Sequence, residues 1–432
     1  MFIQFPEVEG VVSLLSGSVT LPRMRRIRQL YDSTHIENVE LHVASKLNSI
    51  ITNPSWFRGK SICITAGSRG IPALDRILRT ICAQLRVLGA NPFIIPAMGS
   101  HGGGTAEGQR ALLEGYNITE ESIGAPVRAT MEVVQYGRLP NGTPLYCDRF
   151  ASEADGIVLL NKIKPHTDFR GPHESGLAKM IAIGISKFEG ATAFHQQGFH
   201  SFAANILAAA NIFLNKMPVV FSVGIVQNAY DELYEIEFAD KEHTMALDAE
   251  LLVHAKDKMA KFKFKDVDVL IIDEIGKEIS GYGHDPNVTG RPNGHEPGFE
   301  DILHIGKLFI RGLTKKSNHN ASGLAEADIT TRRCLNDVDW GSTWTNLITS
   351  TEIQGCKIPM YANNDLDAVR LAIACCGNIS PDEIKIARVK NTLSLNEIEV
   401  SEGLYKLLKD HPEVQPASEY YSFKFDKEGN FE

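Results

Sequence analysis

The chain has 432 residues, of which 43% are apolar and 22% charged, and its formal net charge is −9. This length accommodates two or three domains with substantial cores, and the composition is typical of soluble globular proteins. The negative charge argues against a nucleic-acid partner, because phosphate binding needs clustered lysine and arginine and the only basic cluster, at 256–266, is flanked by acids.

Targeting, membrane and redox signals are weak. The N-terminus, MFIQFPEVEG, has no basic flank followed by a long apolar core, and no window contains the roughly 20 apolar residues that a membrane span needs. The seven cysteines form no CxxC pair, which is typical of reduced thiols rather than of a disulfide framework or a metal cluster. We therefore expect a cytoplasmic protein without a membrane partner.

The first part of the chain alternates strand-like and helical segments. Strands are predicted at 61–65 and 91–97, with an amphipathic helix between them at 73–89. The runs at 155–163 and 218–226 are continuously apolar, as in strands buried on both faces of a parallel sheet. Strand, Gly-rich turn, helix and strand in this order indicate βαβ units.

A second α/β segment begins near Asp266. It contains a predicted strand at 267–273, a long Gly/Pro/Asn-rich loop at 278–298, a helix at 365–377 and a strand at 383–391. Loops as long as 278–298 are usually functional or disordered. The fold class we predict is α/β, with two α/β domains and mostly parallel sheets: an N-terminal domain at 1–265 and a C-terminal domain at 266–399.

The segment from His166 to His195 is rich in chemically active side chains. His166, His173 and His195 surround Lys179 in a Gly-rich, apolar setting. Imidazole is a common metal ligand and acid/base, and a desolvated lysine is a nucleophile or an attachment point. Taken alone, the segment is equally compatible with surface histidines and an ordinary helical lysine.

Two Gly-rich turns precede this segment, TAGSRGI at 65–71 and MGSHGGGTAEGQ at 98–109. Each turn follows a predicted strand, as does the NKIKPH stretch at 161–166. Ligands of open parallel sheets bind beyond the carboxyl ends of the strands, so the three motifs are expected at one rim.

Together these motifs resemble the nickel-pincer-nucleotide racemase family, whose best-known member is lactate racemase. The resemblance extends from the first Gly-rich turn to the loop near 291. The family's motif residues correspond here to Arg69, His101, Thr105, Glu107, His166, Lys179 and His195.

The resemblance implies a cofactor and roles for these residues. The cofactors would be nickel and a pincer nucleotide, a pyridinium mononucleotide with sulfur arms that hold the metal. Lys179 would carry the nucleotide covalently, and His195 would complete the nickel coordination. His101 and His166 would be the two catalytic bases. Candidate contacts to the cofactor phosphate are Ser68, Arg69, Gly70, Gly102 and Gly103.

The substrate is expected to be a 2-hydroxy acid, with Arg69 as one carboxylate ligand. This chain departs from the family by about three extra residues between His166 and Lys179, in a polar loop. Polar side chains there favour a substrate with further hydroxyls or a second carboxylate, since an unpaired buried polar group costs about 1–3 kcal/mol. The predicted substrate-binding residues of this loop are Asp168, Arg170, His173 and Glu174.

Further substrate contacts are expected from the second domain, where the family has a Gln and a Lys three residues apart. Glu274 and Lys277 have that spacing here, after the strand at 267–273. The long loop at 278–298 could approach the site or could only cap helices and turns. The family also implies a site in the cleft between the domains and a C-terminal tail, 400–432, that returns to the first domain.

The function predicted from the sequence is therefore racemisation or epimerisation at C2 of a polar 2-hydroxy acid such as a sugar acid like gluconate. The reaction would proceed by hydride transfer to and from the nickel-pincer nucleotide. A dicarboxylic hydroxy acid (malate or 2-hydroxyglutarate) and lactate are the alternative substrates. Two other classes stay open: a non-catalytic nickel- or nucleotide-binding protein, and a pyridoxal-phosphate enzyme with its Schiff base on Lys179. A homo-oligomer is compatible with the sequence.

Overall fold

The computed structural model describes residues 1–9, 19–68, 70–198, 201–295, 297–349 and 353–432. The chain divides into two compact units. The central unit comprises Asp32–Met259, and the terminal unit comprises Met1–Tyr31 together with Ala260–Glu432. Within the described residues, no helix is long and apolar enough to cross a membrane.

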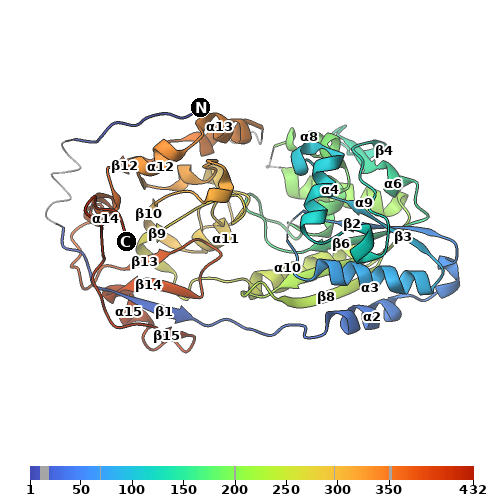
Figure 1. The fold of residues 1–432 in the computed structure, drawn as a ribbon, viewed down its shortest axis with the longest axis horizontal. Coiled ribbons are helices and arrows are strands. Elements are labelled where there is room, and N and C mark those ends of the chain that lie inside the picture. The colour runs from blue at the N-terminus through green and yellow to red at the C-terminus, as the bar shows by residue number, and fades with distance from the viewer. Residues whose placement is uncertain (10–18, 69, 199–200, 296, 350–352) are drawn as a thin grey trace. The chain divides into compact units, whose positions relative to one another are not determined.

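This division differs from the predicted domains at both ends of the chain. The predicted boundary at 265/266 lies close to the observed one, but residues 1–31 and the tail 400–432 both belong to the terminal unit. The reason is strand pairing: β1 (Met24–Gln29) lies between β14 (Glu397–Ser401) and β15 (Val414–Pro416), antiparallel to both. Blue β1 beside the red C-terminal strands shows this in Figure 1.

The central unit is built on a five-stranded sheet of order β3-β2-β6-β7-β8. The first four strands in this order are parallel, and β8 is antiparallel to β7. The strands are β2 (Ser61–Ala66), β3 (Asn91–Pro96), β6 (Gly156–Lys162), β7 (Val219–Gln227) and β8 (Leu233–Asp240); β4 (Val133–Arg138) and β5 (Pro144–Asp148) form a separate hairpin.

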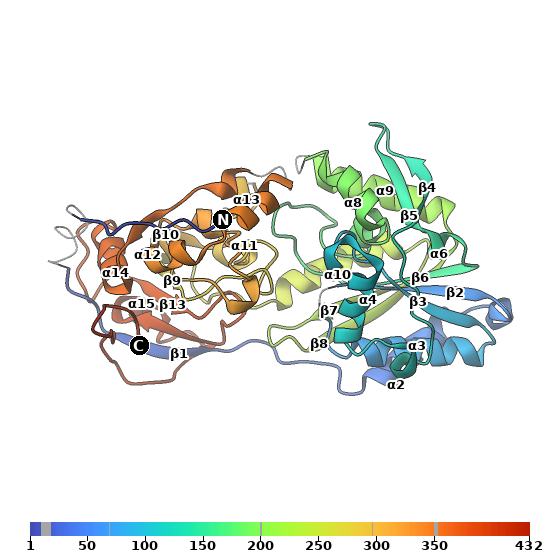
Figure 2. The ribbon, with the colours of Figure 1, turned by 45° about the horizontal axis from the view of Figure 1, so that its top comes forward.

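Helices cover both faces of this sheet, because its strands are apolar on both sides. One core packs the sheet against α2 (Val39–Ile50) and α3 (Leu74–Val87), and the other packs it against α9 (Phe202–Lys216) and α10 (Thr244–Lys258). Figure 2 shows α2 and α3 below the strands and α9 above them. The shorter helices are α4 (Ala106–Gly115), α5 (Glu120–Ile123), α6 (Arg149–Ser152), α7 (Leu177–Lys179) and α8 (Lys187–His195), with one π turn, η3 (Met180–Gly184), and the 3-10 turns η1 (Pro54–Phe57) and η2 (Gly102–Gly104).

The terminal unit contains an eight-stranded sheet of order β12-β11-β10-β9-β13-β14-β1-β15. The five strands from β12 to β13 are parallel, and β14 begins the antiparallel part. Its other elements are β9 (Asp266–Ile272), β10 (His304–Ile310), β11 (Ile329–Thr331), β12 (Met360–Ala362), β13 (Ile386–Val389), α11 (Pro286–Thr289), α12 (Arg332–Asp337), α13 (Trp340–Thr349), α14 (Asp365–Ala374) and α15 (Glu402–Leu408).

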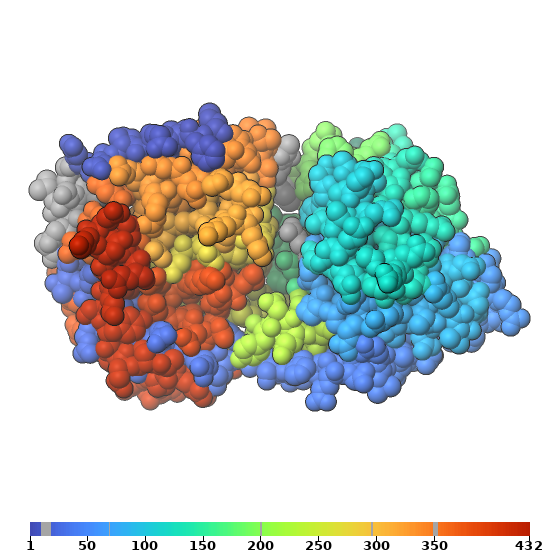
Figure 3. Space-filling model, in the orientation of Figure 1, coloured from blue at the N-terminus to red at the C-terminus, as the bar shows by residue number. Residues whose placement is uncertain are grey.

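The first nine residues lie along the surface of the terminal unit. Phe2 forms a β-bridge with Asp339, and the backbone N–H of Val8 donates to Asn363 Oδ1 at 2.8 Å. In Figure 3 this segment is the blue band over the orange residues. Mixed α/β units with mostly parallel sheets confirm the predicted fold class.

Candidate active site

The three sequence motifs lie at one edge of the central sheet. Ser68 follows β2, His101 follows β3 and His166 follows β6, and these strands are parallel neighbours. The chain moves outward from β2 to β3 and returns on the other side of β2 as β6, so the sheet changes winding direction between β2 and β6. Such a switch point is where open α/β sheets bind ligands.

The His101 side chain is exposed, and it is held by Ser68 from the turn that follows β2. The Ser68 hydroxyl contacts His101 Nδ1, and the Tyr116 hydroxyl donates to the Ser68 carbonyl oxygen at 2.7 Å. Because Nδ1 is engaged, Nε2 is the nitrogen suited to exchange a proton with a substrate. Arg69, the neighbouring candidate, lies outside the described residues.

Glycine is required in the His101 turn. Gly102, Gly103 and Gly104 all have φ between 66° and 69°, a region that other residues rarely adopt. A Cβ on Gly102 would lie 2.6 Å from the backbone nitrogen of Gln109, and one on Gly108 would lie 1.9 Å from the Gly102 carbonyl oxygen. The turn therefore packs directly on α4, which leaves little freedom in the position of His101.

His166 and Lys179 meet at the end of β6. Lys179 Nζ contacts His166 Nε2, while His166 Nδ1 accepts from the backbone N–H of Asp168 at 3.0 Å. One nitrogen of the Lys179–His166 contact supplies the hydrogen and the other the lone pair. His166 can thus hold the proton that Lys179 must lose before its amine acts as a nucleophile.

His195 ends α8 near the same lysine. Burial lowers the pKa of His195 to about 4, and the charge of Lys179 adds to this effect. Two phenylalanine rings connect it to His166: His166–Phe169, Phe169–Phe202 and Phe202–His195 have centroid separations of 4.2, 5.2 and 5.5 Å. His195 is therefore a neutral imidazole at pH 7, the form that ligates metals.

Lys187, the other lysine close to this segment, is not available for covalent attachment. Its side chain is fully buried, and its Nζ lies 2.9 Å from Asp148 Oδ2. Burial raises the pKa of Asp148, although the charge of Lys187 opposes this shift. Between the two lysines, the structure thus leaves Lys179 as the candidate attachment point.

The polar loop between His166 and Lys179 is bound largely by the protein itself. The Glu174 carboxylate is fully buried: Oε2 accepts from the backbone N–H of His166 at 2.7 Å, and Oε1 accepts from Lys256 Nζ at 2.6 Å. His173 Nδ1 lies 2.9 Å from Asp248 Oδ2, and both side chains are buried. Both side chains are thus bound by residues of α10, whereas the sequence predicted that His173 and Glu174 bind a substrate.

Asp168 and Arg170 retain some exposure. Their side chains are 18% and 21% exposed, and Arg170 Nη1 lies 3.5 Å from the Glu174 carboxylate. These two residues remain the loop's candidates for substrate contact.

Asp248 is a site residue that sequence reasoning missed. Its Oδ1 accepts from the backbone N–H of Leu177, the first residue of the turn that carries Lys179, at 2.5 Å. A signal was present in the sequence, since Asp248 stands between Leu247 and Leu251 on the apolar side of its helix. A charge on such a face must find a partner.

The predicted residues of the terminal unit follow β9. Glu274 Oε1 accepts from Asn391 Nδ2 at 3.0 Å, and Lys277 Nζ contacts Asn346 Oδ1. In the long loop, Asp285 caps α11 by accepting from the backbone N–H of Asn287 at 2.9 Å. His284 Nδ1 lies 3.2 Å from the Thr289 hydroxyl. Asp285 thus caps a helix, which is one of the two roles considered for this loop.

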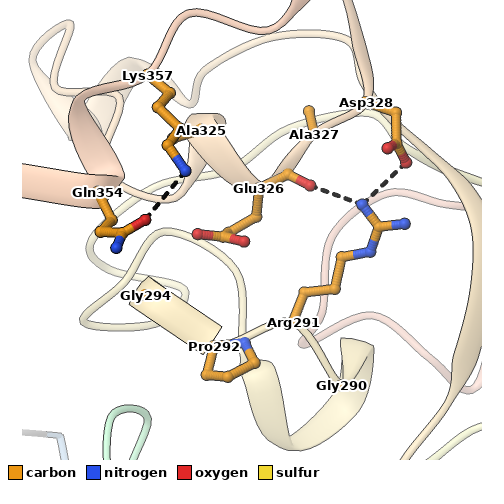
Figure 4. Close-up of a pocket in the computed structure, with 10 residues that line it drawn as sticks. All are labelled: Gly290, Arg291, Pro292, Gly294, Ala325, Glu326, Ala327, Asp328, Gln354 and Lys357. Atoms are coloured by element: carbon orange, nitrogen blue, oxygen red, sulfur yellow. Dashed lines mark hydrogen bonds and ion pairs between the residues drawn. The ribbon is translucent and has the colours of Figure 1, made fainter. Parts of the chain in front are cut away.

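A pocket of about 270 Å³ lies beside this loop within the terminal unit (Figure 4). Its arginine, Arg291, is occupied: Nη1 donates to the Glu326 carbonyl oxygen at 2.8 Å and pairs with Asp328 at 2.9 Å, and Nη2 donates to the Ile305 carbonyl oxygen at 3.0 Å. The guanidinium therefore organises the wall of the pocket.

Comparisons with known proteins agree with this description. Residues 38–206 match the family model of the lactate racemase N-terminal domain. The lactate racemase apoprotein from Thermoanaerobacterium thermosaccharolyticum is similar in fold, with a TM-score of 0.50 and 15% identity over 86% of this chain and 99% of that chain. A protein from Thermotoga maritima matches with a TM-score of 0.47 and 12% identity over 78% of this chain and 82% of that chain.

No curated protein sequence matches the chain significantly. The family model covers α2 to the first part of α9, including the turns with Ser68 and His101 and the segment from His166 to His195. Residues 38–206 are therefore similar to the N-terminal domain of the lactate racemase family, and the chain is similar in fold to lactate racemase.

Proposed function

We propose that the protein is a racemase or epimerase that acts at C2 of 2-hydroxy acids with a nickel-pincer nucleotide. The observation that carries the proposal is the grouping of Lys179, His166 and the neutral imidazole of His195 at the switch point of the central sheet. When bound, the pincer nucleotide would supply an acceptor and donor for the C2 hydride.

The side chains present fit such a group. Among the described residues, no three His, Cys, Asp or Glu side chains come together as a metal site. A single neutral imidazole suits a metal whose other ligands come from an organic cofactor, and nickel(II) accepts nitrogen and sulfur ligands together. Lys179 would hold that cofactor, and His195 would bind its nickel.

The two remaining histidines would move the hydroxyl proton. Oxidising C2 to a keto acid requires a base that removes the hydroxyl proton, and returning the hydride to the other face requires an acid that restores it. His101 on the β3 turn and His166 on the β6 turn come from different strands, as two groups serving opposite faces should. Gly102 and Gly103 remain candidate contacts to the cofactor phosphate, together with Ser68, Arg69 and Gly70.

The substrate we propose is a polar hydroxy acid such as a sugar acid. The sequence predicted four substrate-binding side chains in the polar loop. The proposal of a polar substrate now rests on two of them, Asp168 and Arg170, which are partly exposed. The docking of Glu174 and His173 on α10 favours a second candidate, a small acid such as lactate. Glu274 and Lys277 are proposed as further substrate ligands.

The cofactor proposal is tested by metal analysis and intact mass on protein made in a host that produces the pincer nucleotide. We expect one nickel and one covalent adduct per chain. An aldimine absorption band without nickel would instead identify a pyridoxal-phosphate enzyme. Chiral chromatography of gluconate, malate, 2-hydroxyglutarate and lactate after incubation then ranks the substrates, and fastest turnover of lactate would reject the polar-acid proposal.

A further inference from the structure

A buried ammonium group lies beneath the turn that carries His101. Lys187 is the first residue of α8, it is fully buried, and its φ of 57° is unusual for a residue other than glycine. Three oxygens surround its Nζ: the Pro96 carbonyl oxygen, Gln109 Oε1 at 3.2 Å and Asp148 Oδ2 at 2.9 Å. The ammonium donates hydrogen bonds to Pro96 and Gln109, and its contact with Asp148 is an ion pair.

Gln109 connects this ammonium to the His101 turn. Its Nε2 donates to the carbonyl oxygen of Gly99 at 2.8 Å and lies 3.3 Å from the carbonyl oxygen of His101. The amide has a donor end and an acceptor end. Because Lys187 occupies the acceptor end, the donor end must face the two carbonyl groups on either side of Ser100.

The opposite side of the turn is joined to the lysine segment. The backbone N–H of Gly99 donates to the carbonyl oxygen of Gly184 at 2.9 Å, and Gly184 ends the π turn that follows Lys179. Gly184 itself has no room for a side chain, since a Cβ there would lie 2.7 Å from the Ala97 carbonyl oxygen. The turn is therefore held between α4 and the segment that begins at Lys179.

We infer that Lys187 and Gln109 are positioning residues for His101. The ammonium fixes the orientation of the amide, the amide fixes the backbone at Gly99 and His101, and the imidazole is thereby presented at one place relative to Ser68 and Lys179. This inference rests on the proposed function only in so far as His101 is a base. A misplacement of about 1 Å can cost roughly 100-fold in rate, so a fixed backbone matters at such a position.

The first test uses the protein without cofactor and measures structure rather than turnover. Gln109→Met keeps the length of the side chain but removes both hydrogen bonds to the turn. We expect amide hydrogen exchange at residues 99–104 to accelerate at least tenfold and the His101 ring signals to shift in ¹⁵N-histidine NMR spectra, with exchange in β7 unchanged. Gln135→Met is the matched control, because Gln135 lies on the exposed β4–β5 hairpin and bonds only locally.

Unchanged exchange and unchanged His101 signals in Gln109→Met would overturn the inference. Failure of this variant to fold would overturn it as well, because the amide would then support the whole unit rather than one turn. The pair Lys187→Met with Asp148→Asn removes the buried ammonium together with its countercharge, and we expect the same local increase in exchange.

The second test asks whether the network acts through His101. In cofactor-loaded protein, Gln109→Met should lower kcat about 10- to 100-fold, and the same change in a His101→Ala background should have no further effect. Independent, additive losses would show a general structural role and contradict the inference. If wild-type protein turns over no hydroxy acid, the proposed function fails, while the exchange and NMR measurements still decide the positioning role.

Discussion

At the scale of single residues, two lysines eight positions apart have opposite environments. Lys179 contacts an imidazole that can accept its proton, whereas Lys187 is buried against a carboxylate. Both lie in the sequence segment from His166 to His195. What separates them is burial, which depends on how η3 and α8 pack and on the left-handed backbone at Lys187.

Lys179→Ala should abolish the covalent adduct in protein from a cofactor-producing host, because its amine would be the attached nucleophile. Lys216→Met, a change of a lysine that bonds only the Tyr136 carbonyl oxygen at the surface, is the control and should retain the adduct. Peptide mapping decides between the lysines. An adduct on Lys187 would reject the assignment.

Replacing either proposed base should lower the racemisation rate about 10²–10⁴-fold in both directions, the usual contribution of general acid–base catalysis. Each of His101→Ala and His166→Ala should still bind nickel, since His195 is intact. His243→Ala, at an exposed helix start, is the matched control. Near-normal turnover in either base variant would make that histidine structural.

His284 should make the terminal unit sensitive to acid. Burial lowers its pKa to about 3, with a further contribution from Arg291, so the folded state keeps it neutral. As pH falls below about 6.5, the unfolded chain binds the proton first, and stability is lost progressively down to about pH 3, by up to roughly 4 kcal/mol. Denaturant unfolding between pH 7 and 4 should show a shallower pH dependence for His284→Leu. Parallel curves for the two proteins would contradict this.

At the scale of elements, α10 docks the polar loop that precedes Lys179. Asp248 and Lys256, two helical turns apart, bind His173 and Glu174 respectively. Sequence analysis located the loop and its polarity, but it could not tell a surface facing a ligand from one facing a helix. The partners lie some 75 to 82 residues away in the chain, and single-sequence patterns do not pair such distant groups.

Asp248→Ala should lower the free energy of unfolding by about 2–3 kcal/mol, because it leaves the Leu177 N–H and the His173 ring without their charged acceptor. Urea unfolding measures this loss. If the loop is docked rather than substrate-binding, KM should change by a similar factor for gluconate and lactate. A selective loss of gluconate binding would show that the part of the loop bound by α10, His173 and Glu174, also contacts the substrate.

At the scale of the whole molecule, the predicted alternation of strands and helices was largely correct. The predicted boundary at 265/266 lies close to the observed one, whereas residues 1–31 and 400–432 lie in the terminal unit rather than in the first domain. Local periodicity identified β2, α3, β3, β6, β7 and β9 to within two residues. It could not show that β1 pairs with β14 and β15, because that pairing joins residues that are distant in the chain, such as Met24 with Ser401 and Ile27 with Pro416. The position of the motifs beyond β2, β3 and β6 followed from the βαβ pattern alone.

This topology predicts how the chain can be divided. Residues 32–259 contain the whole five-stranded sheet and the helices that cover both of its faces. They should therefore unfold cooperatively as an isolated fragment. Residues 260–432 alone should not fold, because removing β1 separates β15 from β14. Thermal denaturation followed by circular dichroism checks both fragments. Adding residues 1–31 through a linker should restore the second one, and cooperative unfolding without them would contradict the domain description.

The central claim, a nickel-dependent change of configuration at C2, is tested most directly by following one enantiomer of each 2-hydroxy acid by chiral chromatography. The protein should carry one nickel per chain and the adduct on Lys179. The account predicts formation of the opposite C2 configuration, lost in Lys179→Ala and after removal of nickel. Fully loaded protein that leaves the configuration of every acid unchanged, or turnover that persists without nickel, would contradict it.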